Sequence, residues 1–210
     1  MFVEGEIDKE TLTSIDERIR KGRFSSYGVA FLNSPGGDVV AALAIGRIFR
    51  RLHVSTYVLK GTECTSSCVF LLVGSVYRVV DGRVGLHRPY YASPITDYSK
   101  AAGSVREMER TVQEYFDEMD VPRTIYDRMR QIAPENVEYV DARNFKSLGI
   151  PEIDPSQDQL MRSLHAKKLG LTMSEYTRRA TVVAQECNPL LDQGKSQDFF
   201  DCRRRIFGDW

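Results

Sequence analysis

Three short segments of the chain carry residue types that suit acyl transfer. The first is residues 33–37, Asn-Ser-Pro-Gly-Gly, which follows a short apolar run. Glycines such as Gly36 and Gly37 free the main chain to turn its N–H groups inward, and they let a ligand approach closely. Inward N–H groups at a turn from strand to helix are what an oxyanion hole or a phosphate cradle requires. Taken alone, Pro-Gly-Gly is more often an ordinary tight turn.

The second segment is residues 64–68, Cys-Thr-Ser-Ser-Cys, which enters an apolar run at residues 66–73. A serine at the start of a helix is usually only a cap. This predicted helix is so apolar, however, that its first turn must lie at the edge of the core. A hydroxyl there lies beside the positive end of the helix dipole, and the next N–H can stabilise negative charge. Ser66, together with the N–H of Ser67, is therefore a candidate site group, and the alternative is a simple helix cap.

The third segment is residues 85–89, Gly-Leu-His-Arg-Pro, which puts His87 directly after a predicted strand. Strand ends at the edge of a sheet are where α/β proteins place their sites. His53 follows an arginine-rich helix end and His165 lies on a polar helix, and both positions suit solvent or dipole roles. His87 is therefore a candidate site residue, and the alternative is an ordinary surface histidine.

Strands and helices alternate through the N-terminal two-thirds of the chain and must position these segments. The apolar patterns predict strands over residues 2–7, 28–32, 54–59, 77–80, 84–86 and 137–140. They predict helices over residues 12–19, 39–49, 66–73, 99–119, 122–133 and 142–148. Turns or loops are predicted at residues 33–37, 61–65, 81–82 and 90–97. This alternation indicates βαβ units in a largely parallel sheet.

The pattern changes from Pro155 onward, so we expect two domains, residues 1–154 and 155–210. Two helices, over residues 157–169 and 173–187, lead into a polar tail. That tail is either loosely ordered or pinned by a bridge between Cys187 and Cys202.

The four cysteines fall into two pairs, Cys64 with Cys68 and Cys187 with Cys202. Neither spacing is typical of a zinc site, and no histidine cluster lies nearby, so no metal is predicted. The pairs are either four free buried thiols or two disulfides, and disulfides require an oxidising compartment.

The composition is that of an ordinary globular protein, with 42% hydrophobic and 28% charged residues. The 29 basic and 29 acidic residues balance, which predicts no long-range attraction to nucleic acid. No run is long enough to span a membrane, and no signal peptide precedes the first strand. We therefore expect either a cytoplasmic protein or an exported one whose leader is absent from this sequence.

In this order and at these spacings, residues 33–37, 66–72 and 85–89 resemble the proteolytic subunit of Clp protease. That family has an Asn-Ser-Pro-Gly-Gly turn, a Ser-Met-Gly-Ala-Phe-Leu-Leu nucleophile segment and a Met-Ile-His-Gln-Pro histidine segment. The likeness covers residues 2–153, and three ordered motifs are far more specific than one. It implies an α/β, ClpP/crotonase-like fold of repeated ββα/βαβ units with a mostly parallel sheet, plus C-terminal helices.

The resemblance also implies roles for individual residues. Ser66 matches the nucleophile and His87 the general base. The N–H of Ser67, with that of Gly36 or Gly37, matches the oxyanion donors. The implied activity is hydrolysis of peptide or ester bonds by acyl transfer, without a cofactor. The expected substrate is a peptide or unfolded protein and the expected assembly is a homo-oligomer, while no segment marks a docking site for an ATPase partner.

The third member of a serine–histidine triad is missing from its expected place. In the family an aspartate, or sometimes an asparagine, precedes a segment that residues 141–150 match, and counting back places Val137 there. Valine cannot orient an imidazole. We assign the adjacent Asn136 as the third member, with Glu135 or Glu138 as alternatives. If none of them reaches the histidine, activity falls steeply, and the chain is then a weak or inactive relative acting as a binding or assembly module.

Three further hypotheses follow from narrower likenesses. The Cys-x-Ser-x-Cys pattern is similar to that of Clp-like periplasmic proteins of bacteria, which implies a periplasmic or exported location and a Cys64–Cys68 bridge bracing Ser66. An acyl-CoA enzyme of the crotonase branch shares the fold but does not need a serine–histidine pair. A serine–lysine dyad would use Lys60 or Lys100, although neither lies in a matching motif.

Overall fold

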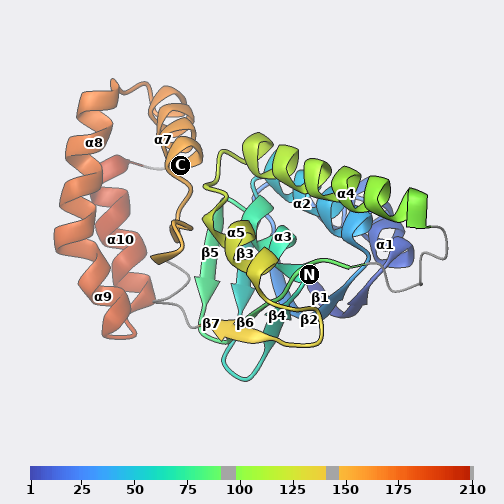
Figure 1. The fold of residues 1–210 in the computed structure, drawn as a ribbon. Coiled ribbons are helices and arrows are strands. Elements are labelled where there is room, and N and C mark those ends of the chain that lie inside the picture. Colours follow the sequence, from blue (N-terminus) through green and yellow to red (C-terminus); the bar gives the residue numbers. More distant parts are fainter. Residues whose placement is uncertain (91–97, 141–146, 209–210) are drawn as a thin grey trace. The chain divides into compact units, whose positions relative to one another are not determined.

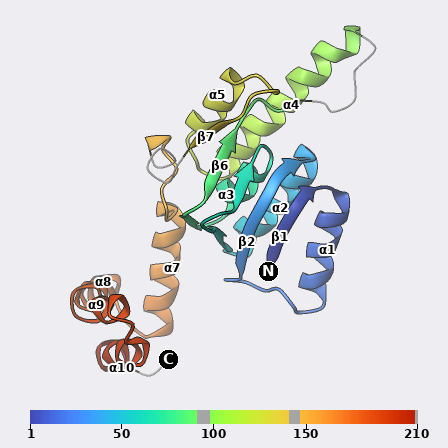
Figure 2. The ribbon, with the colours of Figure 1, turned by 90° about the horizontal axis from the view of Figure 1, so that it is seen from below.

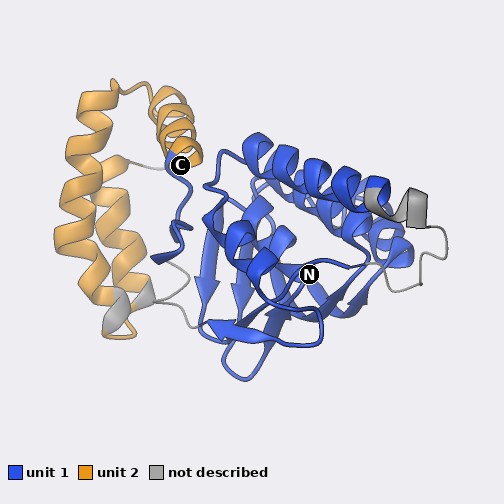
Figure 3. Ribbon diagram, viewed as in Figure 1, with its two compact units in different colours: residues 1–155 blue, residues 156–210 orange. Residues whose placement is uncertain are grey.

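A computed structural model of the chain describes residues 1–90, 98–140 and 147–208 (Figure 1). The chain divides into two compact units, Met1–Pro155 and Ser156–Trp210 (Figure 3). Each unit has its own cluster of buried apolar residues. The predicted loop at residues 90–97 and helix at residues 142–148 fall largely outside the described residues.

The first unit is built on a seven-stranded sheet that is mostly parallel. Its strands are β1 (Phe2–Ile7), β2 (Val29–Gly37), β3 (Ser55–Val58), β4 (Glu63–Thr65), β5 (Tyr77–Val80), β6 (Arg83–Leu86) and β7 (Glu138–Val140). Their order is β5-β3-β2-β4-β6-β7, and β1 pairs with β2. Among the described strands only the β6–β7 pair is antiparallel. The predicted α/β class with a mostly parallel sheet is confirmed.

Strand β2 organises the sheet because it pairs with three others. One edge of β2 pairs with β1, as Figure 2 shows. The other edge pairs first with β3, through residues 29–31, and then with β4, through Ser34 and Cys64. Since β3 and β4 follow one another along the same edge, the sheet divides there. The carboxyl ends of β2, β4 and β6 consequently lie on neighbouring strands.

The helices of the first unit are α1 (Lys9–Arg20), α2 (Val39–Arg51), α3 (Cys68–Gly74), α4 (Tyr98–Glu118) and α5 (Thr124–Gln131). Helix α3 is wholly buried. Helix α4 is tied to it because the Tyr115 hydroxyl donates a 2.6 Å hydrogen bond to the Phe70 carbonyl. Helix α4 also runs alongside α2 (Figure 1), where Arg47 forms a salt bridge with Glu118. Burial and these contacts together fix the position of α3, the helix that follows Ser66.

Two local predictions were wrong. Residues 33–37 do not end the strand, because Gly36 and Gly37 adopt positive φ angles of 104° and 144° and still pair with Glu6 and Ile7 of β1. The predicted loop at residues 61–65 contains β4, a strand too short to show an alternating pattern. The segment at residues 81–82 joins β5 to β6, and these two strands each pair in parallel with a different strand.

The second unit is helical. Its elements are α7 (Pro155–Lys168), α8 (Met173–Val182), the π-helical turn η1 (Val183–Cys187), α9 (Asn188–Asp192) and α10 (Ser196–Phe207). Ala166, Tyr176 and Phe207 form its small core. A disulfide joins Cys187 of η1 to Cys202 of α10, so the C-terminal segment is pinned rather than loosely ordered.

Candidate active site

The sheet topology brings the three predicted segments to one place. Ser66 follows the last residue of β4, His87 follows the last residue of β6, and Gly37 ends β2. Thr65 pairs with Gly85, and the Ser66 N–H donates a 2.9 Å hydrogen bond to the Gly85 carbonyl. Adjacent strands lie ~4.8 Å apart. Residues distant in sequence therefore become neighbours at the carboxyl ends of three adjacent parallel strands.

These strand ends open into a cavity of about 640 Å³ that both Ser66 and His87 line. Gly36 and Gly37 line it as well. Apolar and small polar side chains of α2 and α4 form much of the remaining wall, namely Val39, Val40, Leu43, Met108 and Thr111. A concave, largely apolar cavity with a few convergent polar groups is the usual form of a ligand site.

Ser66 occupies a sharp turn between β4 and α3. Its φ is +57°, in the left-handed region that a residue with a side chain seldom adopts. Such a conformation costs about 1–2 kcal/mol and persists only where the surroundings impose it. Helix α3 begins at Cys68, two residues later than predicted, with Ser67 as its N-cap residue. The serine hydroxyl therefore stands on the turn itself and lies outside the helix.

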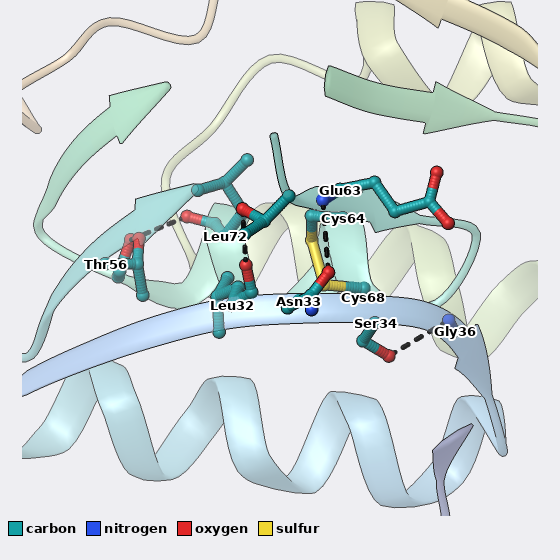
Figure 4. Close-up of a disulfide and its surroundings, with 11 residues drawn as sticks. Leu32, Asn33, Ser34, Gly36, Thr56, Glu63, Cys64, Cys68 and Leu72 are labelled. Carbon is teal, nitrogen blue, oxygen red and sulfur yellow. Dashed lines mark hydrogen bonds between the residues drawn. A yellow bond between two sulfur atoms is a disulfide. The ribbon is translucent and has the colours of Figure 1, made fainter. Parts of the chain in front are cut away.

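A disulfide brackets this turn. Cys64 of β4 is bonded to Cys68 of α3, with 5.2 Å between their Cα atoms, and both residues are fully buried. Figure 4 shows the bridge tying the end of the strand to the start of the helix, beside β2. Of the two alternatives for the cysteines, the structure contains the disulfides. The strand and helix on either side of Ser66 are thus covalently linked.

The turn of β2 packs directly against the serine. A Cβ atom added at Gly36 would lie 2.7 Å from the Ser66 Cβ and 3.0 Å from the Ser67 nitrogen. Only glycine fits this approach. The Gly36 N–H donates a 3.0 Å hydrogen bond to the hydroxyl of buried Ser34 (Figure 4). The Gly36 N–H is thus already engaged, and Gly37 is the other candidate for oxyanion donor.

The Ser67 main chain is the second candidate donor. Its N–H has no hydrogen-bond partner within the described residues, as is usual for the first N–H groups of a helix. The hydroxyls of Ser67 and Thr65 are also buried and without a partner in that part of the chain. Two unpaired buried hydroxyls thus flank Ser66, and such groups are uncommon in native structures.

His87 is oriented by the main chain. Its side chain is almost buried, with 7% of the residue exposed, and Nδ1 lies 3.0 Å from the Arg88 carbonyl oxygen. A carbonyl oxygen can only accept, so Nδ1 carries the proton and Nε2 is left as an acceptor. The Arg88 N–H in turn donates to the Ile132 carbonyl at 2.9 Å. This arrangement gives His87 the tautomer that a general base requires.

No hydrogen bond joins the side chains of Ser66 and His87 among the described contacts. Such catalytic hydrogen bonds are often long until a substrate binds. The absence of this bond therefore does not decide whether Ser66 and His87 act together. The Tyr90 ring lies against His87, with 5.9 Å between the ring centroids, and limits where the imidazole can move.

The predicted third members of the triad make no hydrogen bond to the His87 imidazole within the described residues. They are Asn136, Glu135 and Glu138. Asn136 and Glu135 are exposed, and Glu138 binds Arg128 with a 3.1 Å contact to Nε. The Arg88 carbonyl could not be predicted as the partner of His87, because every residue has a main-chain carbonyl and residue types do not distinguish one from another. The role of Asn136 stays a prediction.

Other candidate groups contribute little to the cavity. Lys60 is exposed and is not among the described residues that line it, and the Lys100 side chain falls outside the described part of the chain. Among described residues, no group of three or more His, Cys, Asp or Glu side chains could hold a metal ion. None of the described helices is long and apolar enough to cross a membrane.

Comparison with known proteins gives a likeness in fold. No family model and no curated protein matches the sequence. A solved structure that does match is a point mutant of ClpP1 from Listeria monocytogenes, with a TM-score of 0.54. The match covers 71% of this chain and 86% of that one at 15% sequence identity. The chain has a ClpP-like fold.

The ClpP-like fold confirms what the three ordered motifs predicted about architecture. At 15% identity the likeness extends to the fold alone and assigns no role to Ser66 or His87. The narrower resemblance to periplasmic Clp-like proteins stays a prediction.

Proposed function

We propose that this protein is a serine hydrolase that cleaves peptide or ester bonds by acyl transfer. Ser66 is the nucleophile and His87 the general base. The N–H groups of Ser67 and Gly37 are the oxyanion donors, with Gly36 shaping the turn that presents them.

The observation that carries this proposal is the contact between His87 Nδ1 and the Arg88 carbonyl at the cavity that Ser66 lines. With Nδ1 donating to the Arg88 carbonyl, Nε2 is free to take the Ser66 proton as Oγ attacks a substrate carbonyl. The main-chain donors then hold the tetrahedral oxyanion. Collapse of this intermediate breaks the amide or ester bond, and the leaving group takes the proton from His87. Water activated by His87 then releases the acyl group.

A hydrolysis assay with unstructured fluorogenic peptides tests this proposal. We expect the native protein to cleave them, and Ser66→Ala or His87→Ala to lower kcat/KM by at least about 10³-fold. Ser67→Ala is the matched control, because it removes the neighbouring hydroxyl but keeps the main-chain N–H. Equal rates for the native protein and Ser66→Ala would overturn the proposal.

The second candidate function is a non-catalytic binding or assembly module. It is favoured by the absence, within the described residues, of a carboxylate or amide side chain hydrogen-bonded to His87. A protein that binds peptides but leaves them intact in the same assay would support this alternative.

We further propose a homo-oligomer that acts on peptides or unfolded proteins in an oxidising compartment, without an ATPase partner. The ClpP-like fold supports the assembly, and the two disulfides support the periplasmic or exported location over the cytoplasmic one. Light scattering of the purified protein tests the assembly, and a single monomeric species would contradict it.

A further inference from the structure

Glu6 lies beside the proposed oxyanion donor. It is the next-to-last residue of β1, pairs in register with Gly36 and lines the cavity. Its Cγ lies 2.9 Å from the position a Cβ would take on Gly37. The side chain of Glu6 therefore lies over the glycine turn, at the wall of the cavity.

The described lining of the cavity is acidic. It contains the carboxylates of Glu6, Asp38 and Glu107 and no lysine or arginine. Glu107 is bound by Arg110, which holds the pKa of Glu107 below its usual value. Asp38 caps α2 by accepting a 2.7 Å hydrogen bond from the Ala41 N–H. Two of the three carboxylates thus already have a partner.

Glu6 makes no salt bridge with any other described residue. Its side chain is exposed, and the same cavity is also lined by the apolar side chains of Val39, Leu43 and Met108. Because this carboxylate is exposed, water and salt screen its charge, so its effect on a bound substrate is modest. An uncompensated carboxylate there disfavours a developing oxyanion and repels acidic substrates, unless the substrate brings a positive charge.

We propose that Glu6 selects substrates with a lysine or arginine side chain close to the scissile bond. The inference rests on the proposed function, since it names the substrate class of the same site. The cation of the substrate pairs with Glu6 and positions the substrate peptide along the cavity. It also offsets the effect of the Glu6 carboxylate on the oxyanion.

Three peptides that differ only in a Lys, Gln or Glu next to the scissile bond test this proposal. We expect the full chain to hydrolyse the Lys peptide with a kcat/KM about three- to fivefold above that of the Gln peptide, in keeping with a partly exposed ion pair. The Glu peptide should be slowest, and added salt should reduce all the differences.

Glu6→Gln should remove the preference for the Lys peptide. Glu4→Gln should keep it, because this matched control makes the same charge change on the same strand outside the cavity lining.

Binding of the same labelled peptides to Ser66→Ala, followed by fluorescence anisotropy, separates the two proposals. Hydrolysis of all three peptides at equal rates, or a preference that persists in Glu6→Gln, would overturn the role of Glu6 and leave the hydrolase intact. Preferential binding of the Lys peptide without any hydrolysis would overturn the hydrolase and support Glu6 as a selector of cations. Neither binding nor hydrolysis would overturn both.

Discussion

The imidazole of His87 is held by the carbonyl of its own neighbour, Arg88. A neutral carbonyl fixes the tautomer as a carboxylate does, but it carries only a partial negative charge. It therefore stabilises the imidazolium that forms during catalysis less strongly. We expect an active enzyme with lower turnover than a complete serine–histidine–aspartate triad would give.

Replacing Asn136 should have little effect on activity. Its side chain is exposed and the Arg88 carbonyl already occupies Nδ1, so kcat/KM of Asn136→Ala should stay within about threefold of the native value. Loss of a true orienting residue costs about 10⁴-fold. A loss of that size in the peptide assay would identify Asn136 as the third member after all.

Replacing Gly36 should damage both stability and activity. Its φ is +104°, and an added Cβ would lie 2.7 Å from the Ser66 Cβ and 2.8 Å from the Thr65 carbonyl oxygen. We expect Gly36→Ala to lower the free energy of unfolding by more than about 2 kcal/mol. A displaced nucleophile should also lower kcat/KM by about 10²-fold.

Gly61→Ala is the control for this substitution. Gly61 also has a positive φ, of 86°, but nothing lies within 4 Å of an added Cβ. It should show only the backbone cost of about 1 kcal/mol in urea unfolding, with normal hydrolysis. Equal losses in the two variants would mean that the contact with Ser66 does not matter.

The strand, turn and helix around Ser66 form one element braced by the Cys64–Cys68 disulfide. The bridge spans only four positions, whereas Cys187 and Cys202 are separated by 15. In the chain-entropy model a longer loop gives the greater stabilisation. The Cys187–Cys202 bridge should therefore contribute more to stability, whereas the Cys64–Cys68 bridge should contribute more to activity.

Removing each disulfide tests this contrast. Cys187→Ala/Cys202→Ala should lower the unfolding free energy by about 3 kcal/mol and Cys64→Ala/Cys68→Ala by about 2 kcal/mol. Peptide hydrolysis should nevertheless fall at least about tenfold only in Cys64→Ala/Cys68→Ala, because only the Cys64–Cys68 bridge positions the nucleophile. Thermal unfolding and kcat/KM measured on the same preparations provide the comparison. Equal activity in both variants would show that the bridge near Ser66 is structural alone.

How much of this site could be predicted depends on whether residue type or chain geometry decides each feature. Ser66, His87 and the paired glycines could be predicted, because their types, order and spacing are distinctive. Strand β4 could not, since three residues carry no recognisable period. The position of Glu6 over Gly37 depends on the register between two strands, which no local pattern encodes.

The whole chain consists of two units whose buried cores do not share residues. Every described residue that lines the cavity belongs to the first unit. Asp154, near the end of that unit, is buried and bound to Arg50 at 2.7 Å. The first unit therefore has a core of its own and contains all the described residues that line the proposed site.

Truncation after residue 155 should leave the proposed activity in place. We expect residues 1–155 to remain folded and to hydrolyse peptides within about threefold of the full chain, since a compact unit can fold alone and all the described residues of the cavity lining belong to it. A truncation at residue 150 is the control, because it removes Asp154 and leaves Arg50 without its carboxylate. Circular dichroism and the peptide assay report the outcome. A folded but inactive 1–155 fragment would show that the helical unit takes part in the site.

The role of Ser66 as an activated nucleophile is tested most directly by reaction with a fluorophosphonate probe. Mass spectrometry of the labelled protein should find one adduct, and peptide mapping should place it on Ser66. The adduct should be absent in Ser66→Ala, strongly reduced in His87→Ala and retained in Ser67→Ala. An unlabelled native protein, or labelling that persists in Ser66→Ala, would contradict this role.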